Sequence, residues 1–280
     1  MDYDVIVVGG GNAAFSAAAS ARDNGAKRVL LLEKAPREKR GGNTHFSGAV
    51  FRFIYNDVSE LDRFVPNAER DYAGFHEGVQ PYPVEVFRDD LVRVTQGRTA
   101  PELAALLIEN SYDTMCWLQD MGRHRFELAL SVMGVRVGNE VKWPRGAMIR
   151  TEHEGVGLSK TWFDTGEKLG IEIRYDTGAQ RLTQAESGRV TGVVARGPEG
   201  FVTFGAKAVV LACGGFETNP EWRLRYLGAP WDHAKVRGSN FNYGDGSRWR
   251  STSAPCRGDI GAAATRRRST PKRPTTACRT

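Results

Sequence analysis

The chain has 280 residues, of which 40% are hydrophobic and 26% are charged, and its formal net charge is +6. It is long enough to bury the core of one large domain or two small ones. Residues 247–280 hold nine of the 39 Lys and Arg and one of the 33 Asp and Glu, which leaves residues 1–246 with a net charge of −2. The positive charge therefore does not indicate a nucleic-acid or membrane surface on the body of the protein.

The cysteines are Cys116, Cys213, Cys256 and Cys278, and no two of them form a C-x-x-C pair. This spacing excludes a disulfide framework and a zinc signature, and it fits a reducing compartment. No apolar run reaches the length of a membrane span, and the N-terminus lacks the pattern of a secretory signal. We therefore expect a cytoplasmic protein with no metal site.

Residues 2–34 predict a strand, a tight turn, a helix and a second strand. Val5–Val8 is a β-branched run that is typical of a parallel strand buried on both faces. The alanine-rich stretch that follows predicts a smooth helix, which ends at Gly25, and Val29–Leu32 is the next strand. This order indicates an α/β fold.

A glycine motif, Gly9-x-Gly11-x-x-Ala14, lies in the turn between this first strand and its helix. Gly9 permits the tight turn, Gly11 lets a pyrophosphate approach the backbone, and Ala14 lets the helix pack near the strand. The helix N-terminus offers unpaired N–H groups and a partial positive charge to the phosphates. Glu33 ends the second strand, where a carboxylate accepts hydrogen bonds from an adenosine ribose. The alternative is a glycine turn in an α/β protein that binds no dinucleotide.

Two later segments favour FAD over NAD. Residues 41–51, GGNTHFSGAVF, form a second glycine-rich loop where an NAD domain would continue with another strand–helix unit. Residues 170–220 predict a strand, a meander that turns at Gly188 and at 197–200, and a buried strand over Ala208–Ala212.

Residues 58–154 separate these two parts and are expected to be mainly helical. TAPELAALLIENSYDTMCWLQDMG, residues 99–122, predicts one long helix with Thr99 and Glu102 as a capping box, Pro101 in the first turn and Gly122 at the end. Its apolar residues are expected in the core: Leu103, Leu106, Leu107, Trp117, Leu118 and Met121.

Four polar residues near the end of this segment are candidates for holding a carboxylate substrate: Arg145, Arg150, His153 and Lys160. Arginine suits a carboxylate because it binds it with two parallel hydrogen bonds. The alternative, that each is an ordinary surface charge, stays open. The run Glu152-His153-Glu154 lacks the spacing of a zinc site.

The chain resembles the FAD-dependent oxidoreductases of the fumarate reductase/succinate dehydrogenase flavoprotein type, and within them it is most similar to the tricarballylate dehydrogenases. The resemblance rests on DVIVVGGGNAAFSAA, LLLEKAP, GGNTHFSG, VVLACGGFETNP and RGSNFNYGDG. It implies a Rossmann-like FAD-binding domain, a parallel sheet with a β-meander, formed by residues 1–57 and 155–246. Residues 58–154 would then be an insert that is part of a substrate or cap region.

The resemblance also implies a set of cofactor-binding positions. They are Gly9, Gly11, Asn12, Ala13 and Ala14 at the pyrophosphate, Glu33 and Lys34 at the ribose, Gly41, Gly42, Asn43, Thr44, Ser47 and Gly48 at the phosphates and flavin, Ala179 at the adenine, and Gly214, Gly215 and Asp245 near the flavin. Some relatives bond a histidine covalently to the flavin. His45 follows the Gly-Gly-Asn-Thr run rather than preceding an Ala-rich stretch, so we expect noncovalent FAD.

The reaction that the resemblance implies is a hydride transfer between flavin N5 and a polycarboxylic acid such as tricarballylate. Electrons would then leave through a separate, membrane-associated partner. The family's catalytic arginine belongs to sequence that has no counterpart here, so no catalytic residue is assigned. The alternatives are a flavin-binding fragment without catalysis and, less in keeping with the charge distribution, a nucleic-acid- or membrane-binding protein that uses its basic C-terminal segment.

Residues 247–280 are rich in Arg, Ser, Thr, Pro and Ala and lack apolar periodicity, so we expect a disordered basic tail. A natural basic arm is one interpretation. The other is a frameshift near Ser247, because a one-register slip converts the residues after it into an apolar–Ala–apolar–polar–apolar pattern like that of the family. On that hypothesis the chain is truncated and inactive alone.

Overall fold

The computed structural model describes residues 2–130, 135–137, 140–143 and 146–253. The strands are β1 (Tyr3–Val8), β2 (Val29–Leu32), β3 (Val50–Phe51), β4 (Phe126–Leu128), β5 (Val135–Val137), β6 (Glu140–Lys142), β7 (Ile149–Thr151), β8 (Glu172–Arg174), β9 (Gly178–Gln184), β10 (Val190–Gly197) and β11 (Gly200–Leu211). The α-helices are α1 (Asn12–Asp23), α2 (Gly42–His45), α3 (Ala68–Asp71), α4 (Phe75–Gly78), α5 (Val84–Thr95), α6 (Pro101–Glu109), α7 (Ser111–Asp120), α9 (Glu154–Lys168), α10 (Pro220–Leu227) and α11 (Asp245–Ser253). Short 3-10 helices occupy Arg37–Lys39, Val58–Arg63 and Trp231–His233.

A six-stranded sheet in the order β8-β2-β1-β11-β10-β9 forms the centre of the fold. The first four strands run parallel, with Val5 beside Val29 of β2 and Ala208 of β11, whereas β11, β10 and β9 form an antiparallel meander. The expected parallel sheet with a β-meander is therefore confirmed. The expectation that Ala208–Ala212 is buried is wrong in part. Val210 is 37% exposed, because this half of β11 pairs only with β1, whereas β10 pairs with residues 200–205.

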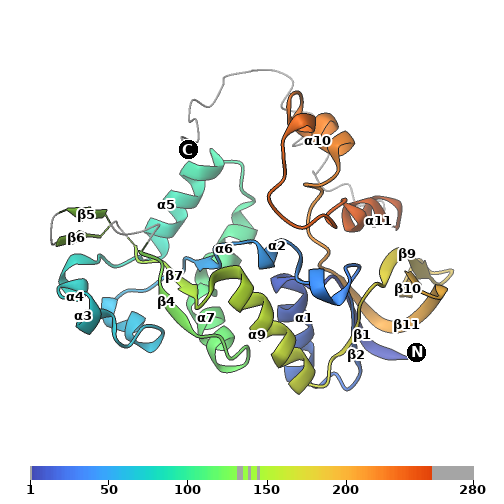
Figure 1. Cartoon of the computed structure of the whole chain (residues 1–280), viewed down its shortest axis with the longest axis horizontal. Helices are drawn as coiled ribbons and strands as arrows, with labels where there is room; N and C mark the ends of the chain where they lie inside the picture. The colour runs from blue at the N-terminus through green and yellow to red at the C-terminus, as the bar shows by residue number, and fades with distance from the viewer. Residues whose placement is uncertain (1, 131–134, 138–139, 144–145, 254–280) are drawn as a thin grey trace.

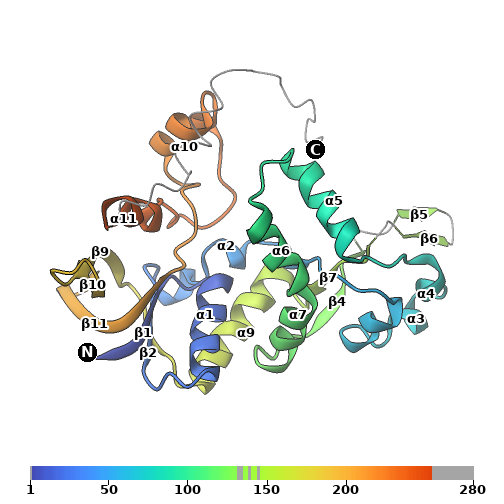
Figure 2. The same ribbon diagram turned by 180° about the vertical axis from the view of Figure 1, so that it is seen from behind.

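The central strands are covered on both faces, which explains their continuous apolar sequence. Val7 and Leu31 join the cluster beneath α1 and α9, while Ile6 and Leu30 join a second cluster on the face of the meander. Figures 1 and 2 both show α1 and α9 side by side against the sheet. The alanines of α1 carry little side-chain volume, so the helix lies close to the strands, with Ala14 fully buried.

The insert packs beside this core and contains strands as well as helices. A three-stranded antiparallel sheet has the order β3-β7-β4, with β7 packed against α9, and β5 and β6 form a separate hairpin. Aromatic rings fill the space inside it, with Phe53, Phe64 and Tyr112 in mutual edge-on or tilted contact. Such ring pairs add stability beyond the area they bury.

The single helix expected over residues 99–122 is wrong, because α6 and α7 are separate helices that meet at Asn110. The Asn110 amide donates to the Leu106 carbonyl, and the buried Ser111 hydroxyl donates to the Ile108 carbonyl while it accepts the Ile54 N–H. These side chains compete with the helical backbone bonds and interrupt the helix. The expected Thr99 capping box is also absent from the described residues, where Ala100 is the N-cap and makes no side-chain bond.

Leu103, Leu106 and Leu107, which were expected in the core, are exposed. These three side chains are 67%, 64% and 58% accessible, respectively, whereas Leu118 of α7 is buried as expected. The residues of α6 that enter the core are Ala104 and Ile108, on the opposite side of the helix.

The chain ends its described part in helix α11, which enters the segment expected to be disordered. Residues 247–253 belong to this helix, and Trp249 is buried against the meander-side cluster. An aromatic side chain that finds an apolar surface stabilises the helix that carries it. The rest of the expected basic tail, residues 254–280, lies outside the described residues.

Candidate functional site

The glycine turn after β1 opens a cleft at the carboxyl ends of the parallel strands. Gly9 has a φ of +118° and donates its N–H to the Leu32 carbonyl at 2.8 Å. A Cβ at this position would collide with the backbone carbonyl of Ala212, so both the conformation and the space require glycine. The turn thus holds β1, β2 and the end of β11 together where α1 begins.

The N-terminus of α1 faces this cleft with unused hydrogen-bond donors. Gly11 is the N-cap and provides no side-chain acceptor, and the Asn12 N–H donates to the Thr44 hydroxyl oxygen at 2.8 Å. Within the described residues, the N–H groups of Ala13 and Ala14 have no protein acceptor. Free N–H groups at a helix N-terminus attract an anion.

Glu33 is a buried carboxylate directly beside the glycine turn. It is only 6% exposed, and one carboxylate oxygen accepts the Ala35 N–H at 2.8 Å. The other oxygen faces Gly10, where a Cβ would overlap it. Burial raises the pKa of Glu33, while backbone N–H groups of Ala35 and Gly41 oppose this shift. A hydroxyl donor beside it would favour the ionised form.

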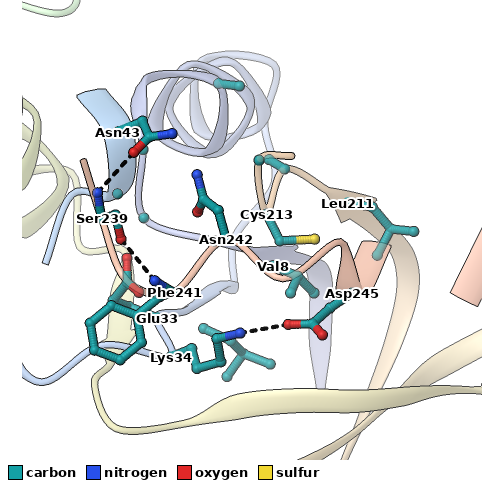
Figure 3. A pocket seen from close by; sticks show the side chains of 18 of the residues that line it. Val8, Glu33, Lys34, Asn43, Leu211, Cys213, Ser239, Phe241, Asn242 and Asp245 are labelled. Carbon is teal, nitrogen blue, oxygen red and sulfur yellow. Dashed lines mark hydrogen bonds and ion pairs between the residues drawn. The ribbon is translucent and has the colours of Figure 1, made fainter. Parts of the chain in front are cut away.

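The second glycine loop forms the next wall and is supported from behind by α9. Gly41 has a φ of +99° and precedes α2, and it packs on Ser159 of α9. Gly155 lies against the carbonyls of residues 44, 45 and 47, and any side chain there would displace them. The Asn43 carboxamide oxygen accepts the Ser239 N–H at 2.9 Å, which joins this loop to the far wall (Figure 3).

The far wall comes from the chain after β11. Gly214, with a φ of +72°, lies against the Asn242 side chain, and burial raises the pKa of the neighbouring Cys213 thiol. The Lys34 ammonium donates to the Asp245 carboxylate at 2.6 Å and lies over the Tyr243 ring, as Figure 3 shows for the ion pair. This contact connects the end of β2 to the start of α11.

The cleft enclosed by these walls has a volume of about 410 Å³, within the range of ligand sites. It brings together most of the residues expected from sequence, namely Gly9, Gly11, Asn12, Ala13, Glu33, Lys34, Gly42, Asn43, Thr44, Ala179, Gly214, Gly215 and Asp245. It does not include Ala14, Gly41, Ser47 or Gly48. Ala14 faces the core, Gly41 supports the loop, and Ser47 stabilises a turn by donating to the Thr44 carbonyl.

The remaining residues that line the cleft were not predicted from the sequence. They are Val8, Gly10, Leu32, Thr177, Leu211, Ala212, Cys213, Glu217, Ser239, Phe241, Asn242 and Trp249. Ser239, Phe241 and Asn242 lie within RGSNFNYGDG, so that motif was a usable signal for them. Trp249 had none, because its surroundings in the sequence resemble a disordered tail.

The substrate candidates of the middle segment do not reach the cleft. Arg150 is held by carboxylates of Glu127 and Glu154, each at 2.7 Å, and Lys160 pairs with Asp164 one turn along α9. His153 is the N-cap of α9. Arg145 lies outside the described residues.

Three further sequence expectations concern His45, a metal site and a membrane-spanning helix. His45 ends α2 and packs edge-on against Phe46, and it does not line the cleft. No group of three or more His, Cys, Asp or Glu is placed to hold a metal ion in the part of the chain that the structure describes. Nor does any helix of that part combine the length and apolar character needed to cross a membrane.

Comparisons with known proteins agree with this geometry. The family described as FAD binding domain matches residues 4–259. Fumarate reductase (cytochrome) of Shewanella frigidimarina is 29% identical over 221 residues, which cover 78% of this chain and 34% of the relative. Urocanate reductase of Eggerthella lenta is 31% identical over 228 residues, which cover 80% of this chain and 34% of the relative.

A solved structure shares the fold over nearly the whole chain. The open conformation of a flavocytochrome c3 fumarate reductase superposes with a TM-score of 0.71 at 25% identity, over 90% of this chain and 40% of that one. The chain spans only 34% of the length of each of the two curated relatives, fumarate reductase (cytochrome) and urocanate reductase.

Proposed function

The chain belongs to the FAD binding domain family, whose relatives include flavoprotein reductases, and its cofactor is FAD. From this premise we propose that the cleft beside α1 holds FAD without a covalent bond. The pyrophosphate would lie at the N-terminus of α1, near Gly11 and Ala13. The adenosine ribose would meet Glu33, and the adenine would lie beside Ala179.

The observation that carries this placement is that one glycine turn has hydrogen-bond donors at one end and a carboxylate acceptor at the other. The α1 N-terminus offers N–H donors without acceptors, which suit a phosphate. A short distance away, Glu33 offers a buried carboxylate, which accepts hydrogen bonds and donates none when ionised. A ribose followed by a pyrophosphate supplies hydroxyl donors and anionic acceptors in that order. The residues present therefore fit FAD.

We propose that the protein oxidises or reduces a polycarboxylic acid such as tricarballylate, with a membrane-associated partner for electron transfer and no role for nucleic acid. When bound, FAD accepts or returns a hydride next to a carboxylate. Two relatives named for fumarate and urocanate support a carboxylate substrate. The residues of this chain contribute by binding the cofactor: the glycine loops approach it with their backbone, and the Lys34–Asp245 pair joins the two walls.

A second candidate is flavin binding without turnover by this chain alone. Among the described residues that line the cleft, the single cation is Lys34, and Asp245 neutralises it. A polycarboxylate needs cations that are available to it. Arg150, which pairs with two glutamates, does not line the cleft, so the described lining offers no cation that is free to bind a carboxylate.

Flavin titration and reduction test both candidates. The purified chain is mixed with FAD, freed of excess cofactor by gel filtration, and examined for the flavin absorption band. A retained band supports FAD binding, and a colourless protein refutes it. The loaded protein is then mixed anaerobically with tricarballylate. Bleaching of the band supports the dehydrogenase, and an unchanged band under conditions where dithionite bleaches it supports flavin binding alone.

A further inference from the structure

Trp162 connects α9 to the first turn of α1 by a side-chain hydrogen bond. Its indole Nε1–H donates to the Asn12 Oδ1 at 2.7 Å, although the two residues lie 150 positions apart. The indole is 1% exposed and stacks on Phe15 of α1, with ring centroids 6.0 Å apart and planes 10° apart. A partly buried hydrogen bond from a fully packed indole favours one orientation of both partners.

Two further rings contact the indole. The His124 ring meets it edge-on, with centroids 4.6 Å apart, and is itself 3% exposed. Trp117 of α7 lies near it as well, at 6.1 Å between centroids. Trp162 is thus packed on several sides and cannot turn its N–H away from α1 without displacing these rings.

This bond decides which way the Asn12 carboxamide faces. An indole N–H only donates, so it selects the amide oxygen and leaves the NH₂ group pointing elsewhere. Asn12 lines the cleft, and among the described residues its Nδ2 has no protein acceptor. The backbone N–H of the same residue is already used by Thr44. The side-chain amide is therefore the donor that Asn12 has left for a ligand.

We propose that Trp162 is a positioning residue for the cofactor: it holds Asn12 so that the Nδ2 amide donates to a phosphate oxygen of FAD. This rests on the proposed placement of FAD in the cleft. The role passes from helix α9 through a single hydrogen bond to the start of α1, which carries the phosphate-binding turn. Trp162 itself touches no cofactor.

The first test compares two hydrogen bonds that tryptophan side chains donate to side-chain oxygens on α1. Trp162→Phe keeps an aromatic ring and removes the N–H, which frees the Asn12 amide to rotate. FAD dissociation constants, measured by flavin fluorescence, should rise about three- to tenfold. The control is Asp23→Ala, which removes the oxygen that accepts the Trp117 indole N–H at 3.2 Å at the far end of α1 and leaves every ring around Trp162 in place. Its FAD affinity should match that of the wild type.

The second test asks whether the effect of Trp162 passes through Asn12. Asn12→Ala should weaken FAD binding by roughly 10-fold or more, since a hydrogen bond to a charged group is lost. Asn12→Asp should weaken it further, because it keeps an acceptor for Trp162 but places negative charge beside the phosphates. In the Asn12→Ala background, adding Trp162→Phe should change the FAD affinity little.

These outcomes separate the inference from the proposal beneath it. If the wild type binds no FAD, the proposed function fails. If the wild type binds FAD and Asn12→Ala binds it equally well, only the positioning role is overturned. A Trp162→Phe effect that is fully additive with Asn12→Ala also overturns it, because a general packing defect would act in either background. The Asn12 variants keep the test open should Trp162→Phe fold poorly.

Discussion

His124 makes the stability of this fold depend on pH in the mildly acidic range. Both of its ring nitrogens are buried without a hydrogen-bond partner among the described residues, and the ring packs against Trp162. Burial alone lowers the pKa of His124 from 6.5 to about 4, because a charged imidazole loses its hydration there. The native fold therefore holds a neutral histidine that the unfolded chain would protonate.

The size of the effect follows from that difference in pKa. Below pH 6.5 the unfolded chain binds the proton and the folded chain does not, so stability falls as the pH drops and levels off only near pH 4. Over the whole window the loss is about 3 kcal/mol at 1.36 kcal/mol for each pH unit. Replacing His124 by leucine, an apolar residue of comparable size, should remove this dependence.

The measurement is urea unfolding followed by tryptophan fluorescence, at intervals from pH 7 to pH 4.5. The free energy of unfolding of the wild type should decline more steeply with falling pH than that of His124→Leu. Other groups such as Glu33, whose buried carboxyl has a raised pKa, titrate in both proteins and cancel in the comparison. His233→Leu is the control, because His233 is exposed. Equal pH slopes for wild type and His124→Leu would refute the argument.

Three further predictions concern the cleft. Glu33→Gln should raise the FAD dissociation constant measured by calorimetry about 10-fold, since it weakens charged hydrogen bonds. Glu186→Gln, at an exposed position, should leave it unchanged. Equal affinities of the wild type and Glu33→Gln would show that Glu33 does not bind the ribose. Gly9→Ala should lose the flavin band and more than about 2 kcal/mol of stability, because its Cβ meets a backbone carbonyl at positive φ. The matched Gly188→Ala, at positive φ with open space around it, should lose only about 1 kcal/mol; similar losses at both positions would contradict the collision. Lys34→Met breaks an ion pair that is about one-third exposed, so its cost in thermal unfolding should stay below about 1 kcal/mol; a larger loss would mean that the pair anchors α11.

The local order of elements around the glycine turn followed from the sequence. The β-branched run of β1, the turn at Gly9 and the alanine stripe of α1 act within about twenty residues, and each has one favourable conformation. Glu33 at the end of β2 was placed in the same way. These features, with the two later glycine segments, were sufficient to recognise the family and its cofactor.

Elements whose form depends on distant partners were not predictable. The break between α6 and α7 depends on Ser111 bonding to Ile54, which is far away in sequence. Arg150 was a reasonable carboxylate ligand until the fold placed two glutamates on it. Trp249 resembled part of a disordered tail until it met the apolar face of the meander.

The sequence by itself determined the cofactor-binding turn, because short-range sterics and hydrophobic periodicity act on neighbouring residues. Only the tertiary structure decided how the cleft is enclosed and supported. The Trp162–Asn12, Asn43–Ser239 and Lys34–Asp245 contacts join segments 150, 196 and 211 residues apart. Such contacts exist only after the sheet brings the segments together, and no local pattern specifies them.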